Sequence, residues 1–405
     1  MPRMDAAERE RRWFDPAPNW LAAGLLAATG FLFLSEKFRW FGFNSHKGWT
    51  VLVAVVLVGV ALLAFFLWWG VGLIFRLRFQ FSIRFLLALF IVVALPFAWF
   101  AAEVQRASAQ RRAADAITRN GSNVFYDSDG TQEKSEPAGA SLGAAWLDTI
   151  FGKDFFGTVV AVSARDDSCL AQLKHLPCVH AIRAPFAEIT DSGLRSVAAV
   201  RGLEKLDIEG SAITDDGLRV LGDLTELREL RVGSTRITDN GLWCLRKLNK
   251  LETVDLDGNG GITDAGMNHL RGLLTLRRLF LGFTRVTDAG VEELSALQEL
   301  EEIDLNATRV GDRGLKAMQA MRKLRVLKVA GTEVTDVGIG YVSELPEIHE
   351  LNIVSTAVTD AGLRYIARLK KLRLLRLGSM FRSRQVTSDG IGTIQKSIPD
   401  CCVTN

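Results

Sequence analysis

A 24-residue motif recurs along the C-terminal part of this 405-residue chain, and no other feature of the sequence constrains the fold as strongly. One copy runs from Leu203 to Leu224, and its hydrophobic positions return from Leu227 and again from Leu251, where the copy contains one inserted residue at Gly260–Gly261. Further copies begin at Val179, Leu276, Leu300, Leu324, Ile348 and, with a longer insertion, Leu372. A fixed period in this range is the signature of a solenoid, in which each repeat is one unit stacked on its neighbours.

Each repeat combines two hydrophobic periods. Leu206 and Ile208 are two residues apart, so they share one face of a short strand. Leu218, Leu221 and Leu224 are three apart, which places them on one face of a helical segment. One repeat cannot fold alone, because burying a few aliphatic side chains gains ~1.5–3 kcal/mol each while ordering the backbone costs ~1–2 kcal/mol per residue. Stacking makes up the difference by burying the flanks of each unit.

An aspartate recurs in the Ile/Val-Thr-Asp-x-Gly turn of each repeat, and it is the most obvious catalytic candidate. An active site needs one aspartate in a special place rather than many in equivalent places. We therefore predict that these carboxylates cap the following helical segments, and that the glycines two residues later permit tight packing. The aspartates are Asp191, Asp215, Asp239, Asp264, Asp288, Asp312, Asp336 and Asp360, and the glycines are Gly193, Gly217, Gly241, Gly266, Gly290, Gly314, Gly338 and Gly362.

The repeats resemble leucine-rich repeats, in particular the class that reads LxxLxLxxTxITDxGLxxLxxL and is related to the cysteine-containing repeats of F-box proteins. The position that is often Asn or Cys in other classes is Ser or Thr here: Ser211, Thr235, Thr284, Thr308, Thr332 and Thr356. The resemblance covers the chain from about Val179 to its C-terminus. It implies an α/β fold, a right-handed solenoid with a parallel sheet on the concave face and helices on the convex face. It implies no particular ligand.

The first hundred residues are largely apolar and indicate a membrane region. Thr50–Phe75 and Phe85–Ala102 carry no charge and are long enough to cross a bilayer, which takes ~20 apolar residues. Asn19–Leu34 is shorter, and it is either a third span or an interfacial or re-entrant segment. We therefore expect a basic tail at 1–18 and a membrane region at 19–102, with transmembrane α-helices at about 19–34, 50–75 and 85–102.

The segments at the entry to the last span and after it resemble the corresponding parts of a bacterial family of membrane-anchored leucine-rich-repeat proteins. The similarity lies in Phe79–Leu87, in the basic helix Gln105–Thr118 and in the short aromatic strand around Gly121–Tyr126. Members of that family often have fewer spans. We expect residues 103–154 to hold a helical linker, a flexible loop and an N-terminal cap (Ala144–Phe156), and residues 155–405 to form the solenoid.

Two orientations in the membrane are possible, with the N-terminus either inside or outside the cytoplasm. Lys and Arg counts tie on the two sides of a three-span arrangement, so the positive-inside rule alone does not decide between them. The basic tail and the dense Arg76–Arg84 loop both favour an N-terminus in the cytoplasm. We therefore predict a bacterial inner-membrane protein with an extracytoplasmic solenoid.

No catalytic, cofactor or metal site is predicted. The net charge of +3 argues against nucleic-acid binding. The five histidines are scattered, and the local group His175, Cys178 and His180, with Cys169 nearby, lacks a zinc-ligand spacing. Five cysteines without a regular framework do not indicate a disulfide scaffold. We expect a protein that is not an enzyme.

Candidate binding residues come from the strand positions that face away from the core. One such residue per strand forms a central column in which basic and acidic side chains alternate, and these charges either pair with each other or bind a partner. Near the middle, carboxylates surround an aromatic residue, so we predict a concave-face site for an unidentified protein or peptide. The column is Arg183, Asp207, Arg231, Asp255, Phe280, Asp304, Lys328, Asn352 and Arg376, and the site is Asp255, Asp257, Arg278, Phe280, Glu302, Asp304 and Lys328.

The sequence leaves three functional classes open. The favoured one is a binding module anchored in the lipid bilayer by the N-terminal spans and acting at the cell envelope. The second is a structural or adhesive envelope protein, whose repeats pack against other copies or wall polymers. An intracellular scaffold becomes the better hypothesis if the solenoid is cytoplasmic.

Overall fold

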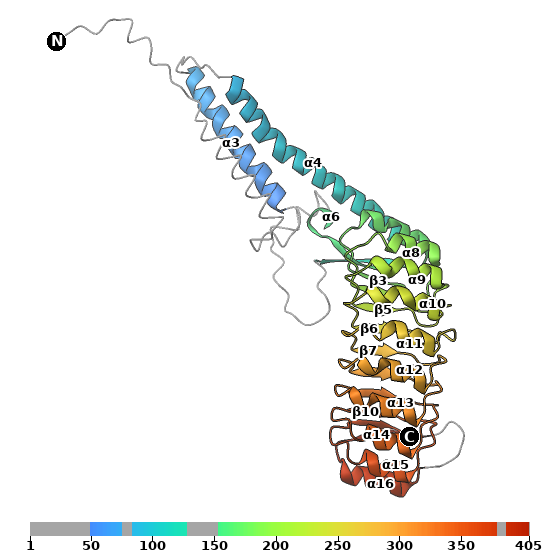
Figure 1. Ribbon diagram of the computed structural model, residues 1–405. Helices are drawn as coiled ribbons and strands as arrows, with labels where there is room; N and C mark the ends of the chain where they lie inside the picture. Colours follow the sequence, from blue (N-terminus) through green and yellow to red (C-terminus); the bar gives the residue numbers. More distant parts are fainter. Residues whose placement is uncertain (1–48, 75–82, 128–152, 379–385, 405) are drawn as a thin grey trace, which may run out of the picture. The chain divides into compact units, whose positions relative to one another are not determined.

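The computed structural model describes residues 49–74, 83–127, 153–378 and 386–404, and these contain one twelve-stranded sheet in which the strands follow each other in chain order (Figure 1). Strands of neighbouring repeats are parallel and lie in register, for example Leu206 opposite Leu230. The strands are β1 (Asn123–Tyr126), β2 (Val159–Ser163), β3 (Ala181–Arg183), β4 (Lys205–Asp207), β5 (Glu229–Arg231), β6 (Thr253–Asp255), β7 (Arg278–Phe280), β8 (Glu302–Asp304), β9 (Val326–Lys328), β10 (Glu350–Asn352), β11 (Leu374–Arg376) and β12 (Cys402–Thr404).

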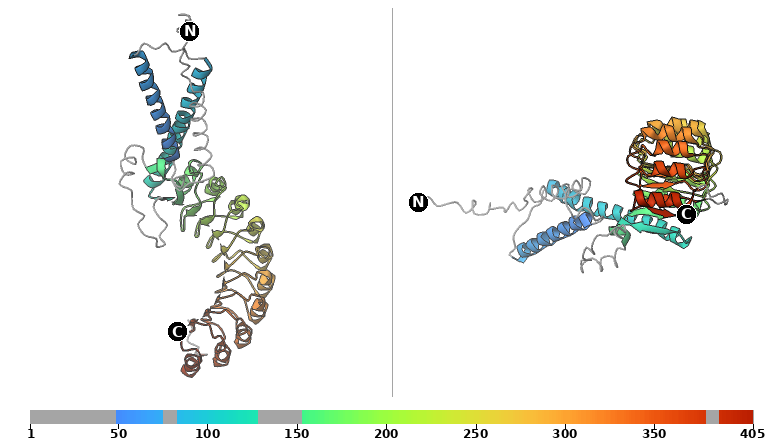
Figure 2. Two further views of the ribbon diagram at one scale, coloured as in Figure 1. Left: turned by 90° about the vertical axis from the view of Figure 1, so that its left-hand side faces the viewer. Right: turned by 90° about the horizontal axis from the view of Figure 1, so that it is seen from below.

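A short helix follows the strand in each repeat, and a 3-10 turn extends several of them. The helices are α7 (Asp167–Leu170), α8 (Asp191–Val197), α9 (Asp215–Arg219), α10 (Asp239–Leu242), α11 (Asp264–Leu270), α12 (Asp288–Glu293), α13 (Asp312–Ala317), α14 (Asp336–Val342), α15 (Asp360–Ile366) and α16 (Ser388–Ser397). Figure 2 shows the repeats bending into an arc, with the strands on the inner side and the helices on the outer side. The predicted solenoid, with its concave parallel sheet, is confirmed.

The chain divides into two compact units, residues 1–112 with 126–158, and residues 113–125 with 159–405. In the second unit the core is one column of aliphatic side chains between sheet and helices. Leu206 and Ile208 from the strand and Leu218 and Leu221 from the helical side are fully buried. At roughly 1.5–3 kcal/mol for each buried aliphatic side chain, this repeated column is the main source of stability.

The repeated aspartates have a different role from the predicted one. The helix N-caps are the preceding threonines: the Thr214 hydroxyl accepts a hydrogen bond from the Asp216 backbone N–H. The carboxylate of Asp215 instead crosses to the next repeat, where it accepts bonds from the backbone N–H (2.8 Å) and the hydroxyl (2.6 Å) of Thr238. The capping prediction was therefore wrong in its assignment, because a carboxylate at the first helical position reaches its neighbour more easily than its own helix.

This Asp–Thr link recurs through the array. Acceptor and donor are Asp167 and Thr190, Asp191 and Thr214, Asp215 and Thr238, Asp239 and Thr263, Asp264 and Thr287, Asp312 and Thr335, Asp336 and Thr359, and Asp360 and Thr387. Asp288 faces Gly311, which offers only its backbone N–H, at 2.7 Å. Each complete link joins two repeats through two charge-assisted hydrogen bonds, the stronger kind of hydrogen bond in proteins.

The glycines of the turn are required by the same link. A Cβ atom at Gly314 would lie 2.7 Å from Oδ1 of Asp288 and 2.8 Å from Cγ1 of Val310, closer than real Cβ contacts. The Gly314 backbone N–H also donates to that Asp288 oxygen at 2.8 Å. The predicted tight-packing role of these glycines is therefore confirmed, with the carboxylate of the preceding repeat as the group that needs the space.

The described residues of the N-terminal part include two long helices, α3 (Trp49–Ile74) and α4 (Ile83–Arg119). The predicted span at 85–102 and the predicted basic helix at 105–118 are one continuous helix of 37 residues, with Pro96 inside it. By length and composition, one helix of the described residues is apolar enough to cross a membrane, over Leu89–Arg119. Thr50–Leu63 forms a shorter apolar helical stretch. The expected segment 19–34 lies outside the described residues.

The expected aromatic strand and part of the expected cap are present around the array. The short aromatic strand is β1, and the last strand of the sheet is β12. Of the expected cap Ala144–Phe156, only α6 (Lys153–Phe156) is described. Within the first unit, the buried Asp154 of α6 accepts hydrogen bonds from Tyr126 (2.8 Å) and Gln110 (3.2 Å), which fix this turn against α4.

Replacing Gly311 by Thr is expected to stabilise the solenoid by about 1 kcal/mol. Gly311 has an extended backbone (φ −122°, ψ −155°) that threonine adopts at the equivalent positions. The nearest atom to an added Cβ is Asp288 Oδ2 at 3.5 Å, so the new hydroxyl restores the missing link. Thermal unfolding of Gly311→Thr and of the reverse control Thr287→Gly should shift in opposite directions. A Gly311→Thr protein that unfolds at a lower temperature contradicts this role for the link.

Candidate functional site

The sheet register brings the predicted central column together on the concave face. Asp207 lies opposite Arg231, Arg231 opposite Asp255, and Asp255 opposite Phe280. The column continues through Asp304, Lys328, Asn352 and Arg376. One outward residue per strand follows from the two-residue period of the strand, since Leu206 and Ile208 turn inward on either side of Asp207.

Phe280 occupies the middle of this face, but it is less exposed than its place in the sequence indicated. Its side chain is half-buried, and the ammonium group of Lys328 lies 5.4 Å from the ring centroid, over the ring face. A cation in this position is attracted by the ring quadrupole. Lys328 also bonds Glu302 at 2.8 Å and approaches Asp304 to 3.6 Å. The Lys328 ammonium group therefore covers one face of the ring, and a partner that binds this face must contact or displace it.

Three carboxylates gather beside Phe280. Asp257 Oδ1 and Asp304 Oδ1 lie 3.2 Å and 3.4 Å from the position that a Cβ would take at Gly282, so both reach the same point above the sheet. Asp255 Oδ1 similarly lies 3.1 Å from the Cβ position of Gly233. Asp304 is 7% exposed, and its carboxylate accepts the Asn306 backbone N–H at 2.9 Å. The absence of a side chain at the two glycines thus gives these carboxylates the room that they occupy.

Burial and mutual repulsion make these carboxylates hard to ionise. Burial, then the charges of Asp255 and Asp304, raises the pKa of Asp257 to about 7, against the opposing effects of the Gly282 N–H and Lys328. Burial also raises the pKa of Asp255, with Glu209 and Asp207 adding to the effect. The pKa of Asp304 is raised by burial in spite of its bond to Asn306 and the nearby Lys328. A positive group from a partner would relieve this repulsion.

Arg278 of the predicted site and Arg231 of the central column form hydrogen bonds within the sheet. Arg278 is exposed and donates to the Thr253 hydroxyl at 3.0 Å rather than to a carboxylate. Arg231 bonds Glu229 on its own strand at 2.8 Å rather than its column neighbours Asp207 and Asp255. Among the ion pairs of the described residues, the alternative in which the column charges neutralise each other therefore holds for Lys328 and Asp304, while Arg231 attracts Asp207 and Asp255 at longer range. Across the described residues, Asp255 and Asp257 take part in no ion pair.

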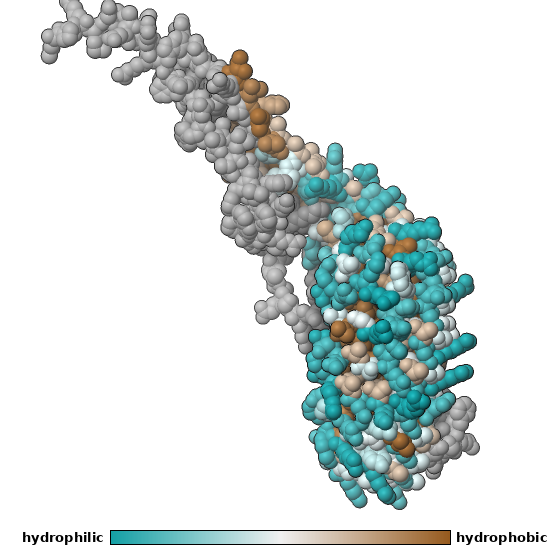
Figure 3. All heavy atoms as spheres, in the orientation of Figure 1, coloured by the Kyte–Doolittle hydropathy of each residue, from teal (hydrophilic) through white to brown (hydrophobic). Residues whose placement is uncertain are grey.

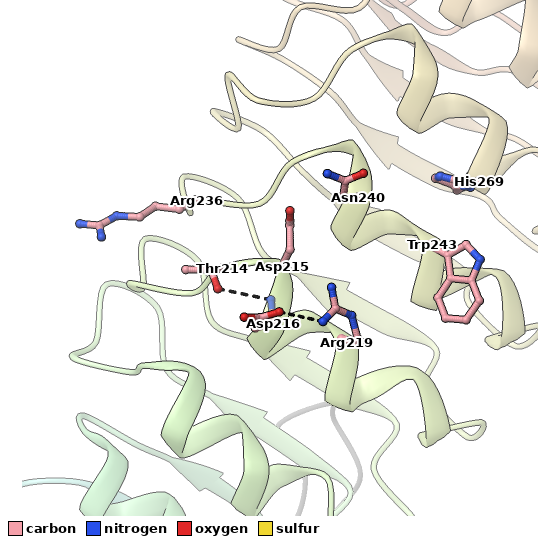
Figure 4. A pocket seen from close by; sticks show the side chains of 8 residues that line it. All are labelled: Thr214, Asp215, Asp216, Arg219, Arg236, Asn240, Trp243 and His269. Carbon is pink, nitrogen blue, oxygen red and sulfur yellow. Dashed lines mark hydrogen bonds and ion pairs between the residues drawn. The ribbon is translucent and has the colours of Figure 1, made fainter.

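A hollow lies on the helical flank of the repeats, where no sequence pattern predicted one. This open groove has a volume of about 620 Å³. Figure 4 shows the side chains that line it, among them the Asp216–Arg219 ion pair (2.8 Å). Trp243, 52% exposed, stands where neighbouring repeats have Arg219 and Asn268. Aligning the repeats would have shown this single aromatic residue. The groove is lined by Thr214, Asp215, Asp216, Arg219, Arg236, Asn240, Trp243 and His269.

The cysteines and histidines considered from the sequence do not converge. His175, Cys178 and His180 are all exposed, whereas Cys169 is buried and lies 3.2 Å from the Ser122 hydroxyl. Cys244 is buried among the helices, its thiol bonds the carbonyls of Leu218 and Gly241, and burial raises its pKa to about 12. In the described part of the chain no group of three or more His, Cys, Asp or Glu residues could hold a metal ion.

The two parts of the chain present very different surfaces. In Figure 3 hydrophobic side chains gather on α4, while the repeats are mostly hydrophilic with scattered apolar spots. Large apolar side chains of α4 that stand largely exposed are Ile83, Leu87, Phe90, Ile91, Leu95 and Phe97. Such a continuous apolar surface is unusual for a protein region in water.

Comparison with known proteins agrees with the repeat architecture. Residues 196–397 match the family model of a leucine-rich repeat region. Internalin C2 from Listeria monocytogenes is 22% identical, with 58% of this chain and 91% of that chain covered and a TM-score of 0.43. A second internalin (inlF) from the same organism is 17% identical, with 64% and 87% covered and a TM-score of 0.44. No curated protein matches the chain.

The stacked strand–helix units define an α/β solenoid of parallel strands. The sequence match over residues 196–397, together with the repeat motif on which these units are built, makes the array a leucine-rich-repeat domain.

The raised pKa of Asp257 predicts how stability depends on pH. Its folded pKa of about 7 exceeds the ordinary value of 3.8, so the folded state binds the proton more tightly than the unfolded chain does. Ionised Asp257 therefore lowers the free energy of unfolding. This loss grows as pH rises from about 4 to 7 and is complete above pH 7. Asp257→Asn should be more stable than wild type at pH 8, with the gap narrowing toward pH 5. Denaturant unfolding at several pH values measures this gap, and a constant gap contradicts the shift.

Proposed function

We propose that this protein is a membrane-anchored leucine-rich-repeat protein whose solenoid binds a protein or peptide at the cell envelope. The observation that carries the binding role is the incompletely neutralised concave face: Asp255 and Asp257 are partly buried and have no ion-pair partner in the described residues. Buried carboxylates whose charge is only partly compensated lower the stability of the sheet, and a partner of complementary charge restores it.

The neighbourhood of Phe280 fits a contact that is energetically central. Aromatic residues at the centre of an interface, ringed by polar groups, contribute most of the binding free energy in many complexes. Here the ring is flanked by Asp255 on β6 and Asp304 on β8, and Lys328 covers one face. A rigid, parallel sheet holds all of these side chains at fixed spacing, so a partner meets a preformed surface.

The membrane anchor is supported by the composition and surface of the N-terminal helices. Along α3, the exposed side chains of Val56, Val60, Leu63 and Leu67 are all apolar and more than half accessible. Such helices are stable in lipid, because their backbone N–H and C=O groups are hydrogen-bonded within the helix and their apolar side chains can face the acyl chains. The solenoid lies outside the cytoplasm in the orientation that the basic tail and the Arg76–Arg84 loop favour.

Truncating Phe280 is expected to release the partner. Phe280→Ala and Asp255→Lys should each weaken binding by roughly 2 kcal/mol, about thirtyfold. Asp216→Lys is the matched control, because Asp216 is exposed on the helical flank and makes only a surface ion pair. The measurement is co-purification of cross-linked partners with the full-length protein from native membranes. If every partner retained by the control is also retained by both concave-face variants, the site is elsewhere or the solenoid is a passive structural element.

Two native cysteines report the orientation of the solenoid. Cys178 and Cys402 are exposed, while Cys169 and Cys244 are buried. A membrane-impermeant maleimide, applied after mild reduction to cells with a permeabilised outer layer and an intact inner membrane, should label the wild type. The Cys178→Ser/Cys402→Ser variant should not be labelled. Labelling that appears only after the inner membrane is lysed places the solenoid in the cytoplasm and favours an intracellular scaffold.

A further inference from the structure

One backbone position in each repeat from β3 to β10 is left-handed. It follows the strand by three residues, and we call these positions the turn column. At each of them the backbone N–H donates to a carbonyl of the next repeat, for instance Phe186 to Glu209 (2.6 Å) and Phe283 to Asn306 (2.8 Å). The column therefore runs unbroken along these repeats. Its members are Phe186, Gly210, Ser234, Gly258, Phe283, Ala307, Gly331 and Ser355, with φ between 53° and 74°.

Phe186 and Phe283 are the exceptions in this column. Every other member is Gly, Ser or Ala, as expected where a bulky side chain is disfavoured. Both phenylalanines adopt left-handed φ angles, 55° and 56°, and yet they are 74% and 68% exposed. Because the rings are mostly exposed, their burial offsets little of the backbone strain. A strained residue with a mostly exposed apolar side chain indicates a role outside the fold.

The backbone positions of the two rings have a definite separation, and the ring of Phe186 is supported by the next repeat. The ring of Phe186 lies over Gly210, where an added Cβ would be 2.9 Å from Cε1, so the next repeat supports it. Phe186 and Phe283 are four repeats apart in the column. With strands ~4.8 Å apart, the two backbone positions are separated by roughly 19 Å. An extended chain covers that distance in about six residues, at ~3.3 Å per residue.

Among the residues that immediately precede the turn column between these rings, the charged ones are acidic. The residues immediately before the turn column, from the first ring to the second, are Pro185, Glu209, Gly233, Asp257 and Gly282. Glu209 and Asp257 are the charged members, and within the described structure neither takes part in an ion pair. The Cβ position of Gly233 lies 3.5 Å from Glu209 Cγ and 3.1 Å from Asp255 Oδ1. Glu209 and Asp257 are both partly exposed at this edge of the sheet.

We propose that Phe186 and Phe283 anchor one extended, basic segment of a partner protein that lies along the turn column. Apolar side chains of the segment, about six residues apart, would pack on the two rings. Lysine or arginine side chains between them would face Glu209 and Asp257. Recognition uses side chains, because the backbone N–H groups of the column are already bonded to the next repeat. The proposal rests on the proposed concave-face function and extends it to the rim of the sheet.

The test uses the full chain in lipid nanodiscs and a fluorescent probe peptide, Leu-Lys-Ser-Lys-Ser-Lys-Leu, whose leucines are six residues apart. Fluorescence anisotropy should show binding that weakens with added salt, and little binding of peptides in which Glu replaces Lys or Ser replaces Leu. Phe186→Gly and Phe283→Gly should each weaken binding about tenfold or more. Neither variant should lower the unfolding temperature, since glycine relieves the left-handed strain.

Two controls separate this surface from others. Trp243→Ala removes an exposed aromatic residue on the helical flank, and Ala307→Gly changes a small residue of the same column, so both should bind the probe as wild type does. Failure of the basic probe to bind, or equal binding by wild type and both phenylalanine variants, overturns the proposal. If native partners are lost with Phe280→Ala but kept with both phenylalanine variants, the concave-face function stands and the turn-column proposal is wrong.

Discussion

The structure depends on contacts between repeats rather than within them. The aliphatic column supplies most of the free energy, because Leu206, Ile208 and their equivalents are removed completely from water only when repeats are stacked. The Asp–Thr link adds specific hydrogen bonds to this non-directional hydrophobic contact. A carboxylate of one repeat bonds the backbone and hydroxyl of the threonine that caps the next helix, so helix start and repeat spacing are fixed together. The turn glycines follow from that geometry.

The fold could be predicted in most of its parts because each depends on local periodicity. The two-residue period of Leu206 and Ile208 determined the inner face of the sheet, and the repeat length determined the register of the column from Asp207 to Arg376. The role of Asp215 could not be predicted in this way. Its carboxylate can accept from an N–H of its own helix or from the N–H of Thr238 in the next repeat. Which bond forms depends on the distance between repeats, and the sequence period does not determine that distance. The same holds for α4, where a continuous helix joins two segments of different polarity.

The candidate site was predictable as a set of positions and not as a set of interactions. The repeat alignment placed Phe280 between Asp255 and Asp304, as the strand register has them. It did not place Lys328 over the ring or direct Arg231 to Glu229, since long side chains choose among several partners within reach. Phe186 and Phe283 were missed because a left-handed turn is a property of the backbone. Their alignment with glycines and serines at the repeat period was the signal that could have found them.

A rigid array with a partly neutralised inner face and two strained rings on its rim fits a surface built to hold an extended partner. Such a surface stays preformed only if the links between repeats are strong. Amide hydrogen exchange tests this most directly, at the backbone N–H groups of Thr214, Thr238 and Thr287 that donate to the aspartates. We predict protection of these loop amides equal to that of the neighbouring strands. Exchange as fast as in an unbonded loop would show that the links are open in solution and that stacking alone sets the shape.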